Sequence, residues 1–107
     1  MHVQQDRLRP WVADVFLAAG CEQAEANRIA DRLVDANLVG HDSHGVIRVP
    51  SYVQWLRAGK VRAGQAIQVA FENDVLAVVD GQYGFGQTIG EQAIQLGIKK
   101  CARHGLA

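Results

Sequence analysis

The sequence predicts an α/β protein in which a helical N-terminal part precedes two strands and a further helix. Apolar residues recur at three- and four-residue spacing up to residue 58 and alternate with polar residues from residue 66, and helical spacing returns from residue 88. This change of period divides the chain into a helical region over residues 1–62 and the incomplete start of an α/β domain over residues 63–107.

Two helices are predicted over residues 8–19 and 23–39. Gly20 closes the first helix and Gly40 ends the second, as glycine commonly does at helix C-termini. Pro10 fits a helix that begins just before it, whereas an earlier start predicts a kink. The apolar faces consist of Leu8, Trp11, Val12, Val15, Phe16 and Ala19 in the first helix, and of Ala26, Ile29, Ala30, Leu33, Val34, Asn37 and Leu38 in the second.

A third helix is predicted over residues 46–58. Pro50 lies near its start, where it removes one backbone donor and biases Val49 away from helical angles. The apolar side of this helix consists of Val49, Val53 and Leu56, and Gly59 follows it.

The remaining elements are two strands and a helix. Residues 66–72 alternate in character, residues 75–79 form a short apolar run, and Asn73-Asp74 between them is a turn signal, so a hairpin is predicted. A helix follows over residues 88–102, with Gly105 as its cap. Because an isolated hairpin is marginal in water, we expect the chain to be the front part of a larger fold.

Charge and composition argue against several classes of protein. Eleven Lys and Arg residues balance eleven Asp and Glu residues, which gives no electrostatic reason to expect nucleic acid or an anionic membrane as a partner. The N-terminus has no apolar signal core, and no segment has the length of a membrane span. Cys21 and Cys101 lie far apart without metal-ligand spacing, which favours reduced thiols in a cytoplasmic protein over a disulfide.

Residues 41–59 are the most informative segment for function. They place His44, Arg48 and Tyr52 at four-residue intervals, so a helix through them would present three polar groups on one face. A proton-donating imidazole beside a carboxylate-binding guanidinium is what reduction of a 2-oxo acid requires. A solvated surface pair is the alternative. Ser43 and His44 are not expected to form a nucleophile–base pair, because adjacent helical positions do not face each other.

Other motifs receive structural interpretations. His41 and His44 lack a third ligand, so no metal site is predicted. Gly84-Phe85-Gly86 departs from dinucleotide-binding spacing, and we interpret its glycines as giving a tight turn and close helix packing. Positive charge that offsets the dipole of the last helix is supplied by Lys99, Lys100, Arg103 and His104.

An Asp-Ser-His-Gly core lies within residues 36–46, which read ANLVGHDSHGV. With Arg48, Pro50 and Tyr52, this segment resembles the signature of the type 2 malate/L-lactate dehydrogenase family, and the similarity covers nearly the whole chain. The family is unrelated to the Rossmann-fold lactate and malate dehydrogenases. It includes ureidoglycolate, sulfolactate and diketogulonate oxidoreductases and cyclic imino-acid reductases.

The resemblance implies the N-terminal part of an NAD(P)-dependent oxidoreductase that transfers hydride between a nicotinamide cofactor and a 2-hydroxy or 2-oxo acid, or a cyclic imino acid. It implies that His44 donates the proton and that Ser43 assists it. Arg48 would bind the substrate carboxylate or share in proton transfer, and Tyr52 would line the pocket. It further implies a homodimer of non-Rossmann fold whose cofactor-binding residues lie beyond the end of this chain, so the 107 residues alone are expected to be inactive.

A small helical binding or interaction module without catalysis is the alternative function. The first two helices superficially match a helix-turn-helix, but the second presents Glu22, Glu25, Asp31 and Asp35 against Arg28 and Arg32. That charge pattern suits a phosphate backbone poorly, so no salt-sensitive gel shift with duplex DNA is expected. The chain could instead dock through its apolar stripes onto a partner.

Overall fold

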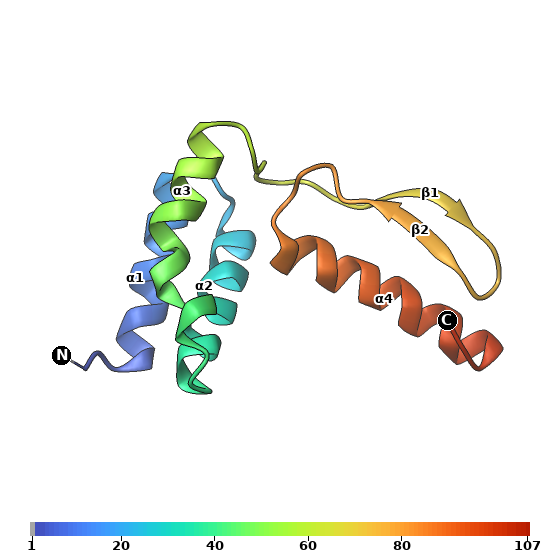
Figure 1. The fold of residues 1–107 in the computed structure, drawn as a ribbon, viewed down its shortest axis with the longest axis horizontal. Coiled ribbons are helices and arrows are strands. Elements are labelled where there is room, and N and C mark those ends of the chain that lie inside the picture. Colours follow the sequence, from blue (N-terminus) through green and yellow to red (C-terminus); the bar gives the residue numbers. More distant parts are fainter. Residues whose placement is uncertain (1) are drawn as a thin grey trace. The chain divides into compact units, whose positions relative to one another are not determined.

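The computed structural model describes residues 2–107, whose contacts divide into two compact units after Gly64 (Figure 1). The first unit holds three helices, α1 (Gln5–Ala18), α2 (Gln23–Leu38) and α3 (Val49–Arg57), with the 3-10 turns η1 (Asp42–His44) and η2 (Val46–Arg48) before α3. The second unit holds β1 (Gln68–Glu72), β2 (Ala77–Asp80) and α4 (Gly86–His104). Within residues 2–107, no helix combines the length and apolar character needed to cross a membrane.

The core of the first unit lies between α1 and α2. Its buried residues recur every three or four positions, so each helix presents one stripe to the other. They are Val12, Ala13 and Phe16 in α1, and Ala26, Ile29, Ala30, Leu33 and Val34 in α2. Trp11 and Val15, expected on this face, are instead 52% and 42% exposed. The buried stripe of α1 is therefore narrower than predicted. The exposed Trp11 ring instead lies 5.4 Å from the Arg7 guanidinium.

The buried carboxylate of Glu25 ties α2 to the end of the first unit. Glu25 is only 6% exposed, although it stands in the first turn of α2. Its Oε1 accepts a hydrogen bond of 2.8 Å from the backbone N–H of Gly64. This acidic residue therefore has a tertiary partner in addition to the positive end of its own helix.

The helix starts differ most from prediction. α1 begins at Gln5, so Pro10 lies inside it. α3 begins at Val49 and not at residue 46, because Gly45 has extended backbone angles (φ −92°, ψ −153°) and the next three residues form the turn η2. Pro50 then falls in the first turn of α3, where its missing N–H leaves no bond unmade.

The predicted hairpin is confirmed: β1 and β2 pair antiparallel, with a bulge between Val69 and Phe71. α4 lies along this hairpin (Figure 1), and its Gln92 Oε1 accepts a 2.8 Å hydrogen bond from the backbone N–H of Ile67. Between β2 and α4, Gln82 and Tyr83 adopt left-handed φ angles of 53° and 60°. The glycines of this segment predicted a tight turn, but the sequence did not indicate the left-handed angles of Gln82 and Tyr83, because neither residue favours that conformation.

Candidate functional site

The segment that carries the histidine motif begins where α2 ends. Gly40 adopts φ +80°. In this conformation the backbone N–H of Gly40 donates to the carbonyl oxygen of Asn37 (3.0 Å), and the N–H of His41 donates to the carbonyl oxygen of Ala36 (2.7 Å). This pair of bonds is typical of a helix closed by glycine. The chain then passes directly into η1, which contains Ser43 and His44.

Ser43 lies between the two residues that the sequence singles out. Its Oγ is 3.0 Å from Nδ1 of His44, and its carbonyl oxygen accepts a 2.7 Å hydrogen bond from Nε of Arg48. All three residues are exposed. The structure thus brings an imidazole and a guanidinium to one shared neighbour.

The geometry of this segment differs in two ways from that of a continuous helix. His44 and Arg48 do not lie on one continuous helix, because the extended Gly45 separates η1 from η2. Ser43 and His44 contact each other although they are adjacent, which their spacing on an α-helix did not predict. The proximity of the three groups therefore comes from the loop and not from helical periodicity.

Tyr52 lies among aromatic side chains of the helical unit. Its ring centroid is 5.6 Å from that of Trp55, at an angle of 27° between the ring planes, and 6.3 Å from that of Phe16. The residue is half-buried. Its assignment to a substrate pocket therefore rests on the resemblance alone, since these ring contacts tie it to the core.

Asn37 is the residue that sequence reasoning missed. Its Nδ2 donates a 2.8 Å hydrogen bond to Oδ1 of Asp42, and its Oδ1 accepts a 2.9 Å bond from the backbone N–H of Val46. Asn37 belongs to the apolar stripe predicted for α2. A single carboxamide in that stripe, three residues before a helix-ending glycine, was the available signal.

The glycines after β2 serve close packing. A Cβ on either Gly81 or Gly84 would lie 2.9 Å from the side chain of Ile89 in α4. These positions need glycine because a helix side chain already fills the space beside them. This fits the interpretation as a tight turn and not a dinucleotide loop.

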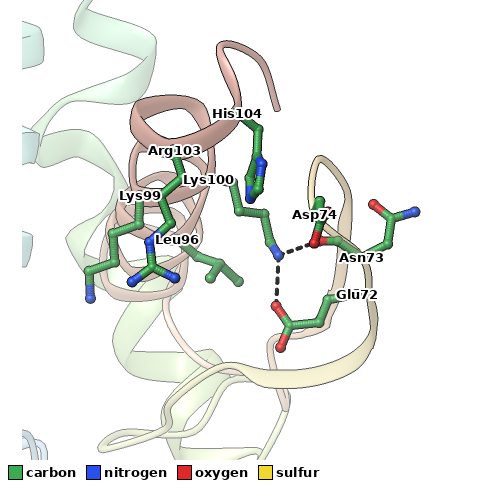
Figure 2. Close-up of a pocket in the computed structure, with 8 residues that line it drawn as sticks. All are labelled: Glu72, Asn73, Asp74, Leu96, Lys99, Lys100, Arg103 and His104. Atoms are coloured by element: carbon green, nitrogen blue, oxygen red, sulfur yellow. Dashed lines mark hydrogen bonds and ion pairs between the residues drawn. The ribbon is translucent and has the colours of Figure 1, made fainter.

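A cleft of about 400 Å³ lies between the hairpin turn and the end of α4 (Figure 2). Lys100 reaches across it, and its Nζ lies 2.8 Å from Oε2 of Glu72 and 2.6 Å from the carbonyl oxygen of Asn73. Asp74 adds a second carboxylate to the lining, which also includes Lys99, Arg103 and His104. The basic cluster therefore has a pairing role in addition to offsetting the helix dipole.

A family model described as malate/L-lactate dehydrogenase matches residues 3–107. The chain belongs to this family. Hydroxycarboxylate dehydrogenase B of Escherichia coli (strain K12) is 38% identical over 100 residues, which is 94% of this chain and 28% of that protein.

Solved structures agree with the family match. The malate dehydrogenase of Pyrococcus horikoshii superimposes with a TM-score of 0.93 at 36% identity over 98% of this chain. Delta1-piperideine-2-carboxylate reductase of Pseudomonas syringae superimposes with a TM-score of 0.83 at 26% identity over 96% of this chain. The matches cover 30% and 31% of those two chains, so this chain spans about a third of their length. The predicted α/β fold of a helical part followed by a hairpin and a helix is confirmed.

Proposed function

We propose that this chain supplies the proton-donating and carboxylate-binding residues of an NAD(P)-dependent oxidoreductase that acts on a 2-hydroxy or 2-oxo acid or a cyclic imino acid. The observation that carries the proposal is the placement of Ser43 between His44 and Arg48, with contacts of 3.0 and 2.7 Å. Membership of the dehydrogenase family supports the reaction class.

The three residues have separate roles in this proposal. Reduction of a 2-oxo acid adds a hydride to the carbonyl carbon and a proton to its oxygen, and His44 donates that proton. Because Ser43 contacts Nδ1, the Nε2 nitrogen of His44 is the one that faces the substrate. Arg48 keeps its terminal guanidinium nitrogens for the substrate carboxylate, since its contact with Ser43 uses Nε.

The family implies a nicotinamide cofactor, the source or acceptor of the hydride. Gly81 and Gly84 do not fit a phosphate cradle, because Ile89 occupies the space beside them. We therefore assign no cofactor-binding residue to this loop. Comparing kcat/KM of the intact enzyme with NADH and with NADPH would identify the preferred cofactor.

The remaining parts of the proposal rest on the sequence pattern, which predicts the division of the chain and a cytoplasmic location, and on the family resemblance, which implies a homodimer. Residues 1–62 form a helical region that carries the motif, and residues 63–107 begin the cofactor and substrate domain. The division of contacts after Gly64 supports this arrangement. The protein works as a homodimer in the cytoplasm, which sedimentation of the intact enzyme and cell fractionation would test.

The test uses a graft enzyme, defined as the malate dehydrogenase of Pyrococcus horikoshii in which the matching segment is replaced by residues 3–107 of this chain. We expect His44→Ala to lower its kcat with oxaloacetate by about two to four orders of magnitude, the usual size of a general acid contribution. The measurement is steady-state oxidation of NADH or NADPH. The 107-residue chain alone is expected to show no turnover.

His104→Ala is the matched control, because His104 is an exposed histidine at the end of α4, in the second unit, and is not part of the motif. Circular dichroism and gel filtration establish that both variants fold. A loss below about threefold in a folded His44→Ala graft would remove His44 from the proton transfer. A folded graft with no activity at all would refute the competence of this segment.

The alternative, an interaction module without catalysis, is favoured by apolar side chains that are exposed in the second unit. They are Val69, Phe71, Val78, Ile94 and Ile98. Such side chains mark contact surfaces when they form a patch. The alternative predicts that His44→Ala leaves the turnover of the graft unchanged, so the same assay separates the two functions.

A further inference from the structure

Asn37 connects both sides of the histidine turn. Its carboxamide nitrogen donates to Asp42, which precedes Ser43, and its carboxamide oxygen accepts from the backbone of Val46, which follows Gly45. Ser43 and His44 lie between these two anchor points. One side chain from the last turn of α2 thus holds the segment at its beginning and at its end.

The backbone of the histidine turn packs directly against the Asn37 side chain at Gly45. The residue is buried, and a Cβ on it would overlap the Asn37 carboxamide. Its own φ is negative, so the need for glycine is steric and not conformational. The contact with Asn37 therefore requires that residue 45 have no side chain.

We propose that Asn37 is a positioning residue for the Ser43–His44 pair and that Gly45 is glycine to permit it. Both polar groups of the carboxamide are used, so an apolar or charged replacement would lose at least one bond. The loss would free residues 42–46 to take other conformations, in which Oγ of Ser43 need not meet Nδ1 of His44. The inference rests on the proposed function for its catalytic meaning, but the geometry it predicts can be measured without catalysis.

The first experiment records the ¹⁵N shifts of the His44 ring in the 107-residue chain. The contact with Ser43 favours one tautomer of the neutral imidazole, so its tautomer ratio should differ from that of the urea-unfolded chain. Asn37→Asp and Gly45→Ala are each expected to move the ratio towards the unfolded value by about threefold or more, the size expected for one hydrogen bond. Asn27→Asp is the matched control, because Asn27 also lies in α2 and its Oδ1 accepts a hydrogen bond from Gln23 of the same helix, not from the histidine turn.

The second experiment exchanges donor and acceptor. Asn37→Asp places a second carboxylate beside Asp42 and removes the donor between them. The double variant Asn37→Asp/Asp42→Asn restores a donor on residue 42 and keeps the acceptor for Val46, so the native tautomer ratio should return. Loss of fold alone would not predict such recovery.

The graft enzyme supplies the kinetic readout. Asn37→Asp and Gly45→Ala should lower kcat about tenfold to a hundredfold, the scale expected for a misplaced catalytic group, and the double variant should recover it. KM for oxaloacetate should change little, because Arg48 remains. Unchanged tautomer ratios in folded Asn37→Asp and Gly45→Ala would overturn the inference. Full activity of His44→Ala would overturn the proposed function and leave the tautomer result standing.

Discussion

At the scale of single residues, burial separates the two cysteines. Both thiols are free, but Cys21 is buried at the turn between α1 and α2 whereas Cys101 is exposed on α4. Burial, with a smaller contribution from the charge of Glu25, raises the pKa of Cys21 to about 11. Because the thiolate is the reactive form, the two cysteines should differ in chemistry.

We expect iodoacetamide at pH 8 to modify Cys101, and to react with Cys21 about a hundredfold more slowly in the folded chain than in the unfolded chain, because the pKa of Cys21 rises from 9.0 to about 11. Mass spectrometry of the folded chain measures both rates. In urea the two rates should converge. Equal rates in the folded chain would contradict the buried position of Cys21.

The same raised pKa predicts a pH dependence of stability. Below pH 9 the thiol of Cys21 is neutral in the folded and unfolded chains, so it does not make the free energy of unfolding depend on pH. Between pH 9 and about 11 only the unfolded chain loses the proton, so the free energy of unfolding should fall over this range. Urea titrations of the native chain and of Cys21→Ala check this, because the variant should lack that part of the fall.

At the scale of elements, some glycines are required by packing and others are not, and the sequence does not distinguish the two kinds. Gly84 lies against Ile89 and Gln65, whereas nothing lies within 4 Å of the Cβ position of Gly97 inside α4. Helical periodicity could predict α4 and the cap at Gly105, which has φ +82°. It could not tell which glycine is required by packing, because that depends on a neighbour from another element.

Gly97→Ala should stabilise α4 by about 0.5–1 kcal/mol, since alanine forms helices better than glycine and meets no neighbour here. Gly84→Ala should destabilise the second unit by about 1–3 kcal/mol through overpacking against Ile89. Hydrogen exchange of the α4 amides measures both effects. The same sign for both variants would contradict the packing described for Gly84.

At the scale of the whole molecule, the chain consists of two compact units joined after Gly64. Both tryptophans, Trp11 and Trp55, belong to the first unit, so their fluorescence reports on its unfolding. This unit also contains the histidine motif and Asn37. The second unit has few buried side chains, chiefly Phe85 and Thr88. Its stability therefore depends on fewer apolar contacts than that of the first unit.

Ile29→Val should lower the stability of the first unit by about 0.5–1.5 kcal/mol, because Ile29 is fully buried between α1 and α2. Tryptophan fluorescence during urea unfolding measures this change, and hydrogen exchange of α4 should remain unaffected. Ile47→Val is the control, because Ile47 is 70% exposed and should change little. A matching loss of protection in α4 would show that the units unfold together.

Patterns along the chain were enough to predict the order and type of the α-helices and strands, the glycines that end the helices and the family. These depend on local spacing and on short motifs, which are read along the chain. Three contacts became visible only in the folded chain: Ser43 with His44, Asn37 with both sides of their turn, and the buried Glu25 with Gly64. The reason is that such contacts depend on the path of a tight loop and on partners distant in the chain, and neither leaves a periodic signal in the amino acids.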